Sequence, residues 1–178
     1  NNRHMFVSAR YDIGEMMKKG EIYEGVITQF DFPNKGILRM EDRKVVVKGA
    51  LPGQKVQFMI TKKKSGMAEG KLLCVLEPAP MEDMQPVCPY FGECGGCTYQ
   101  TMSYKNQLAF KERLVKQILD KVLLKEGSGS VDYVWEGICA SPVIEGYRNK
   151  MEFTFGDAYK GGPLALGLHK KGSFHDIL

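Results

Sequence analysis

The sequence predicts a mainly β protein with some α structure: a small five-stranded, OB-like β-barrel followed by an α+β domain with a cysteine-rich loop and one long helix. Three observations lead to this prediction. Short strand-like runs fill residues 18–77, a proline-rich acidic segment follows them, and one long stretch of helical period comes later. The chain has 178 residues, 43% of them hydrophobic, which suffices for one ordinary core or two small ones.

The predicted barrel begins after residues 1–17, which show no clean period and are assigned to an N-terminal extension. Its strands are short and rich in β-branched residues, with turn-forming residues between them. The strand-like runs are EIYEGVITQF, GILRM, KVVVKG, KVQFMITKK and KLLCVLEP. Closure into a barrel removes exposed sheet edges, which stabilises so small a core. An SH3-like barrel without a nucleic-acid role fits the same pattern.

A domain boundary is predicted near residue 78, where EPAPMEDMQPV is typical of an extended linker or acidic loop. The second domain then covers residues 78–178. Ser103 is the expected N-cap of a helix over residues 104–126, in which Glu112 can pair with Lys116. The apolar residues that recur at helical spacing are expected to pack into the second core: Tyr104, Leu108, Val115, Ile118, Leu119 and Val122.

The remainder of the chain has β character. Gly127 to Ser130 end the helix, and VDYVWEGICA is predicted to be extended. The runs KMEFTFGDAY and LALGLHK flank the turn residues Lys160 to Pro163, which predicts a hairpin. The final FHDIL is apolar and strand-like, so we expect the domain to continue beyond it.

Positive charge is concentrated in the predicted barrel. The whole chain has a formal net charge of +4, and residues 18–77 hold twelve Lys or Arg against seven Asp or Glu. The densest run is Lys62-Lys63-Lys64, which suits an anionic partner but also suits a solvated turn. No run of 18 apolar residues and no secretory leader is found, so we expect a cytoplasmic protein with no membrane partner.

Three of the five cysteines lie within ten residues, a pattern that favours metal ligation over disulfides. Gly95 and Gly96 between Cys94 and Cys97 suit a tight turn that brings two thiolates to one metal, and Cys88 would supply a third. An iron–sulfur cluster, a zinc ion and unligated thiols all remain open. Candidate fourth ligands are Cys139, His169 and His175, whereas Cys74 is expected to be a small buried hydrophobe.

Several segments resemble the RNA 5-methyluridine methyltransferases, the S-adenosylmethionine-dependent, iron–sulfur enzymes that methylate uracil C5 in ribosomal or transfer RNA. The most specific match is CPYFGECGGCTYQ with the Tyr104-Lys105 that follows. The segment LPGQKV resembles the TRAM domain at the N-terminus of these enzymes, and GYRNKMEF and LGLHKKGS are similar to their central domain. The resemblance spans residues 18–178.

This resemblance implies a [4Fe-4S] cluster held by Cys88, Cys94 and Cys97, with a fourth cysteine beyond the segment that matches residues 174–178. Cys139 does not match that ligand, so the cluster is expected to be labile or empty in this chain. His169 and His175 then become surface residues. Since no methyltransferase segment is recognised, we expect S-adenosylmethionine to bind elsewhere in the parent enzyme and this chain to be inactive alone.

The resemblance further implies that this chain is a monomer that grips RNA, with ribosomal RNA as the expected partner. The expected RNA contacts are Lys62, Lys63, Lys64, Arg148, Asn149 and Lys150. Arginine can bind phosphate through two hydrogen bonds or stack on a base, whereas lysine adds a point charge. The alternatives are a stand-alone RNA-binding module with structural zinc and, for the second cluster, pairing with Glu145 or Glu152.

Overall fold

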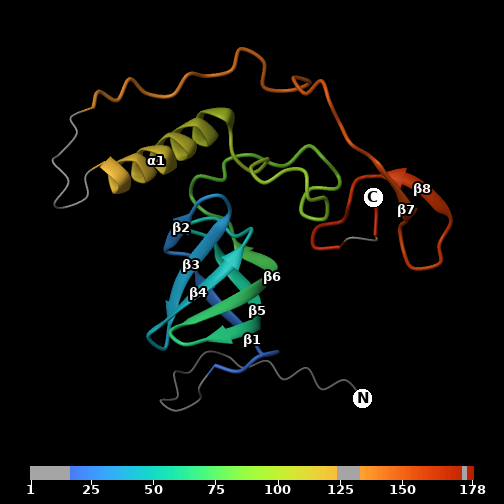
Figure 1. The fold of residues 1–178 in the computed structure, drawn as a ribbon, viewed down its shortest axis with the longest axis horizontal. Coiled ribbons are helices and arrows are strands. Elements are labelled where there is room, and N and C mark those ends of the chain that lie inside the picture. Colours follow the sequence, from blue (N-terminus) through green and yellow to red (C-terminus); the bar gives the residue numbers. More distant parts are fainter. Residues whose placement is uncertain (1–16, 124–132, 174–175) are drawn as a thin grey trace. The chain divides into compact units, whose positions relative to one another are not determined.

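The computed structural model describes residues 17–123, 133–173 and 176–178, and it separates into two compact units (Figure 1). The first unit is Asn1–Pro78 and the second is Ala79–Leu178. Each unit is described by itself. Within the described residues, no helix is long and apolar enough to cross a membrane.

The first unit is a curled sheet of six strands, and the predicted β-barrel class is confirmed (Figure 1). The spatial order is β1-β5-β6-β4-β3-β2, in which β4 and β6 are parallel and the other neighbours antiparallel. The strands are β1 Ile22–Val26, β2 Gln29–Asp31, β3 Lys35–Met40, β4 Arg43–Lys48, β5 Lys55–Lys64 and β6 Met67–Glu77. One more strand is present than the sequence predicts, because the first predicted run is divided into β1 and β2.

The division between β1 and β2 curls the sheet. β1 pairs with β5, whereas β2 pairs with β3 at the other end of the strand order. Ile27, which lies between them and is 1% exposed, donates its N–H to the Gln54 carbonyl at 2.9 Å. The next residue, Thr28, donates its N–H to the Ile37 carbonyl at 2.9 Å. One continuous run thus joins the two edges of the sheet.

The core of the first unit lies inside the curl, and Phe58 is its largest fully buried side chain. The buried cluster comprises Met17, Ile27, Leu38, Val45, Val47, Ala50, Val56, Phe58, Ile60 and Ala68. Met17 is fully buried, so its assignment to the N-terminal extension is wrong. Its N–H donates to Glu41 Oε2 at 3.0 Å, and its carbonyl accepts a hydrogen bond from Lys63 Nζ at 2.6 Å.

The helix of the second unit, α1 Tyr104–Leu123, begins where the sequence predicts. The Ser103 hydroxyl accepts a hydrogen bond from the Asn106 N–H at 3.4 Å, as an N-cap does. The Asp83 carboxylate accepts the Ser103 N–H at 2.6 Å, and this hydrogen bond lowers the pKa of Asp83. The segment around Asp83 is therefore folded against the start of α1, so of the two predicted alternatives the acidic loop is observed and the extended linker is not.

The apolar stripe predicted on α1 is a core surface only in part, because Tyr104, Leu108 and Leu119 are half-buried but the other three residues are exposed. Val115, Ile118 and Val122 are 44%, 43% and 61% exposed, and the buried helix residues are Phe110 and Leu114. Tyr99 packs edge-on against Phe110 with ring centroids 5.8 Å apart. Burial raises the pKa of the Tyr99 hydroxyl.

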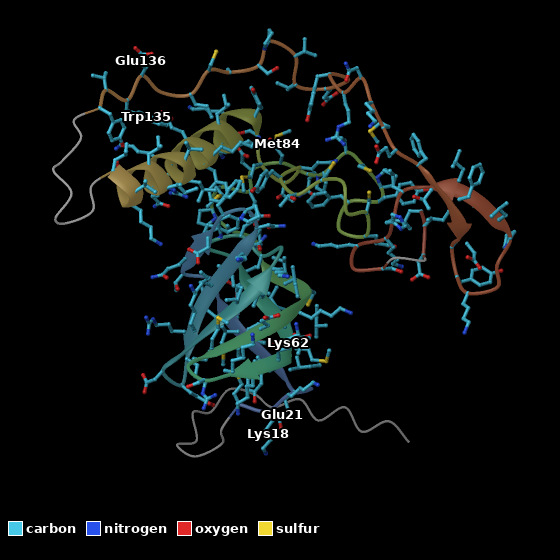
Figure 2. The ribbon with its side chains drawn as sticks, in the orientation of Figure 1. Lys18, Glu21, Lys62, Met84, Trp135 and Glu136 are labelled. Atoms are coloured by element: carbon cyan, nitrogen blue, oxygen red, sulfur yellow. The ribbon has the colours of Figure 1, made fainter. Side chains whose placement is uncertain are left out.

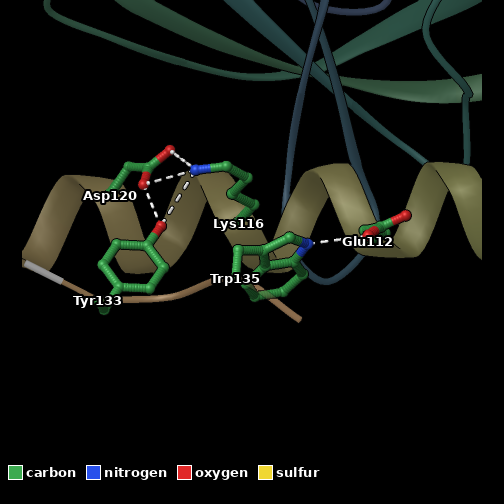
Figure 3. Close-up of polar contacts among 5 residues, drawn as sticks. All are labelled: Glu112, Lys116, Asp120, Tyr133 and Trp135. Atoms are coloured by element: carbon green, nitrogen blue, oxygen red, sulfur yellow. Dashed lines mark hydrogen bonds and ion pairs between the residues drawn. The ribbon is translucent and has the colours of Figure 1, made fainter. Parts of the chain in front are cut away.

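The run VDYVWEGICA, for which the sequence indicates β character, forms no strand in its described residues 133–140, and this segment lies along α1 through polar contacts (Figure 3). Trp135 Nε1 donates to Glu112 Oε1 at 2.8 Å. Lys116 Nζ lies 3.1 Å from the Tyr133 hydroxyl and 3.1 Å from each carboxylate oxygen of Asp120. The Tyr133 hydroxyl also donates to Asp120. The predicted Glu112–Lys116 pair is replaced by these contacts.

Acidification is expected to release this segment from α1. The Tyr133 hydrogen bond and then the Lys116 ammonium lower the pKa of Asp120 in the folded chain. A depressed pKa contributes stability above the ordinary aspartate value of about 4, and that stability is lost as pH falls through the folded pKa. The single tryptophan, Trp135, reports the change, so its emission should shift to the red in this acidic range. Asp120→Asn should give the shifted emission at neutral pH, and an unchanged spectrum in that variant would contradict the coupling.

The predicted hairpin is confirmed as β7 Thr154–Asp157 and β8 Leu164–Gly167, in antiparallel register. The described end of the chain lies beside it. Leu168 and Leu178 exchange backbone hydrogen bonds at 3.1 and 2.8 Å, and the Ile177 N–H donates to the Asp157 carbonyl at 3.2 Å. Ile177 is 2% exposed, so this short segment packs with the hairpin.

Candidate RNA-contact residues and cysteine loop

The three consecutive lysines lie at the end of β5, where an irregularity in the strand changes their direction. Ile60 is opposite Gly70 but Lys62 is opposite Glu69, so Thr61 is an extra residue in β5. After this bulge, Lys62 and Lys64 are exposed, while the intermediate Lys63 is opposite the buried Ala68. Successive side chains of a strand alternate between its faces, and the bulge makes Lys63, in place of Lys62 and Lys64, the lysine on the core side.

Only part of this lysine run is available to a partner. Lys63 Nζ donates to the Met17 carbonyl, and Lys62 Nζ lies 3.7 Å from Glu69 Oε2. Figure 2 shows Lys62 on the outside of the first unit. Lys63 thus has a structural role at the barrel core, a role that consecutive lysines in a sequence do not reveal.

Arg148, Asn149 and Lys150 lie together in an exposed, irregular segment before β7. Lys150 Nζ pairs with Glu152 Oε1 at 2.8 Å, as one alternative from the sequence anticipates, and Arg148 Nη1 lies 3.7 Å from Met151 Sδ. A shallow hollow of about 360 Å³ is lined by Arg148, Lys150, Met151, Glu152 and Leu168. Asn149 is exposed between the two cations, although it does not line the hollow.

The cysteine loop is a series of tight turns. The Phe91 N–H donates to the Cys88 carbonyl at 3.1 Å, and the Cys94 N–H donates to the Tyr90 carbonyl at 2.9 Å. The Gln100 side chain accepts the Cys88 N–H at 3.2 Å. The Gly96 N–H approaches Cys94 Sγ to 3.3 Å, a close contact of backbone with sulfur at one of the two glycines.

Residues near the hairpin hold this loop in place. The Gly95 N–H donates to the His169 carbonyl at 3.4 Å, and the Lys171 N–H donates to the Glu93 carbonyl at 2.6 Å. Lys170 Nζ also pairs with Glu93 Oε2 at 3.3 Å. These contacts join segments far apart in the chain, so the sequence offers no local signal for them.

The other candidate ligands point to different partners. His169 Nε2 lies 3.2 Å from Thr154 Oγ1, and Cys139 Sγ is 3.9 Å from the Ala140 carbonyl. His175 lies outside the described residues. Cys74 is exposed at the outer end of β6, so its prediction as a buried hydrophobe is wrong.

Cys88, Cys94 and Cys97 are free thiols, a donor type that suits iron–sulfur clusters and zinc. Across the described part of the chain, no three His, Cys, Asp or Glu side chains converge closely enough to hold a metal ion. The three thiols of the loop suit a thiophilic metal, but their sulfur atoms must come closer together to bind one.

A family model for the TRAM domain matches residues 17–73, which include all of β1 to β5 and the buried Met17. Several curated proteins are similar to most of the chain. An uncharacterised RNA methyltransferase of Caldanaerobacter subterraneus subsp. tengcongensis is 45% identical over 162 residues, which are 91% of this chain and 34% of that protein. Another, from Clostridium acetobutylicum, is 43% identical over 164 residues, 92% of this chain and 34% of that protein.

A relative with a more specific name is similar over a comparable span. The 23S rRNA (uracil(1939)-C(5))-methyltransferase RlmD of Vibrio vulnificus is 34% identical over 152 residues, 83% of this chain and 32% of that protein. The chain thus spans about a third of the length of these relatives. The chain thus contains a TRAM domain over residues 17–73 and is similar, along most of its length, to the first third of proteins named RNA methyltransferases.

Proposed function

We propose that this chain is the RNA-binding portion of an S-adenosylmethionine-dependent RNA uracil-C5 methyltransferase that acts on ribosomal RNA. The observation that carries the proposal is the similarity of the same chain to a TRAM domain and to a 23S rRNA uracil-C5 methyltransferase. The exposed cations on both units support RNA as the partner. In this proposal the chain acts as a monomer in the cytoplasm, and the methyl donor binds elsewhere in the enzyme.

In this proposal, the residues of this chain bind RNA and leave the target base accessible to the catalytic residues. Lys64 on the barrel and Arg148 on the second unit can contact phosphates from exposed positions. In a paired stem the neighbouring bases cover both faces of the uracil ring, so the bound uridine must be unpaired or turned out of the stack. The parent enzyme adds a nucleophile to the ring and transfers the methyl group with residues outside this chain.

Fluorescence anisotropy with a labelled, uridine-containing loop of ribosomal RNA tests the proposal. We expect the chain to bind this loop more tightly than a DNA duplex of equal length, with affinity that falls as salt rises. The control titration uses the same RNA annealed to its complement. Equal binding of loop and duplexes, or none of any, would contradict the proposed function.

We further propose that Cys88, Cys94 and Cys97 ligate a [4Fe-4S] cluster. The support is their thiol chemistry and the Gly96 N–H beside Cys94 Sγ, because amides close to sulfur stabilise thiolate charge. The cluster would cross-link the turns of the loop. A fourth ligand comes from outside these three cysteines.

The cysteine loop gives a direct metal prediction. After anaerobic reconstitution with ferrous iron and sulfide, the chain should bind both elements, and Cys94→Ser should lose most of them. Cys139→Ser and Cys74→Ser are matched controls, because both thiols lie outside the loop, and each should bind iron as the unaltered chain does. Zinc in place of iron, with no labile sulfide, would favour the alternative of an RNA-binding module with structural zinc.

A further inference from the structure

Three lysines form a continuous row across the first unit. In the strand register, Lys35 of β3 is directly opposite Lys48 of β4, and Lys48 is directly opposite Lys71 of β6. All three are exposed, and each neighbours a buried position on the core side of its strand: Gly36, Val47 and Gly70. Since successive side chains of a strand alternate, the three lysines share the outer face.

The acidic residues closest to this row in the sheet form ion pairs with other lysines. Asp31 is opposite Lys35, but its carboxylate pairs with Lys44 Nζ at 3.1 Å. Glu69 precedes Lys71 by two positions on the same face and pairs with Lys62. Among the described residues, Lys35, Lys48 and Lys71 have no ion pair. Like charges directly opposite each other destabilise a sheet, so this row is suited to an external anion.

An exposed aromatic ring lies near one end of the row. Phe32 is 62% exposed in the turn between β2 and β3, three residues before Lys35. The Gly49 N–H, directly after Lys48, donates to the Asn34 carbonyl at 3.1 Å and ties that turn to the end of β4. Cations beside an accessible ring are the two elements of a single-strand site, where phosphates meet lysines and a base stacks on the ring.

We propose that Lys35, Lys48 and Lys71 bind successive phosphates of single-stranded RNA, and that Phe32 stacks on one of its bases. This inference rests on the proposed function and deepens it, because it assigns the main RNA contact of the barrel to three lysines that are separated in the sequence and aligned only by strand pairing. It also differs from the sequence expectation, which places the barrel contact at Lys62 to Lys64. In that run, Lys62 and Lys63 already have partners within the fold.

A triple variant, Lys35→Gln, Lys48→Gln and Lys71→Gln, tests the row by anisotropy with the ribosomal RNA loop over a range of salt. Loss of three phosphate contacts should lower the slope of log affinity against log salt by about 2 and weaken binding at low salt on the order of tenfold. The control variant, Lys18→Gln, Lys19→Gln and Lys55→Gln, removes the same charge elsewhere on the unit and should keep most of the slope. Replacing the row with three arginines should retain it.

Phe32→Ala separates stacking from charge. It should weaken binding on the order of tenfold and leave the salt slope unchanged, because no ionic contact is lost. Equal losses in the row and control variants would overturn the inference, since net charge would then explain binding. Full binding by the row variant would overturn it too, while the proposed function would stand. Absence of RNA binding by the unaltered chain would overturn the proposed function and the row with it.

Discussion

Phe58→Ala is expected to remove most of the stability of the first unit. Phe58 is fully buried, is the largest side chain of the core cluster and stacks on Tyr23 with ring centroids 6.4 Å apart. Truncating a buried phenylalanine costs about 3–5 kcal/mol of the free energy of unfolding. Small domains have total stabilities near the lower end of the usual range of about 5–15 kcal/mol, so this loss removes most of the margin.

Urea denaturation followed by circular dichroism measures this effect, and Phe32→Ala is the matched control. Both variants remove the same side chain, but Phe32 is 62% exposed and should cost little free energy of unfolding. A small, similar shift of the denaturation midpoint in both variants would contradict the stabilising role of the buried Phe58 side chain.

Gly36→Ala is expected to have the second largest effect. A Cβ at Gly36 would lie 2.6 Å from the Ala50 carbonyl oxygen and 3.0 Å from the Ala50 Cβ. The closest of these atoms belongs to the backbone, which cannot rotate away, so β3 must shift relative to the residues after β4. Overpacking of this kind costs about 1–3 kcal/mol of the free energy of unfolding.

Gly25→Ala provides the comparison, because its Cβ would meet the end of a flexible side chain. The nearest atom is Leu38 Cδ1 at 2.5 Å, and Leu38 can change rotamer to make room. Thermal unfolding should therefore show a larger loss of melting temperature for Gly36→Ala than for Gly25→Ala. The reverse order would contradict the close packing of Gly36 against Ala50.

Local patterns predicted those elements whose causes are local. Ser103 does cap α1, and the glycines before Pro163 do lie between the two strands of a hairpin. The barrel class also followed from the spacing of turn residues, but Ile27 was missed as the corner between β1 and β2. Its inward turn depends on hydrogen bonds with residues near Gln54, which no window around Ile27 contains.

The candidate contacts were less predictable, because register decides them. The bulge at Thr61 separates Lys63 from Lys62 and Lys64, although the sequence presents three equivalent lysines. Conversely, Lys35, Lys48 and Lys71 are far apart in the chain and form a row only through strand pairing. The cysteines are identifiable from their spacing, whereas the ion pair between Glu93 and Lys170 depends on tertiary structure.

The continuous run from Ile22 to Asp31 also affects when the first unit can fold during its synthesis. β1, the first half of this run, pairs with β5, and β4 pairs with β6. Neither pair can form until the later strand of the two has been synthesised. The hairpins of β2 with β3, β3 with β4 and β5 with β6 can form from neighbouring sequence alone, whereas the pairs of β1 with β5 and of β4 with β6 cannot. Contacts of this long sequence separation slow folding, because loop entropy is lost before they form. The barrel is therefore a late product of translation, completed after β6 has emerged from the ribosome.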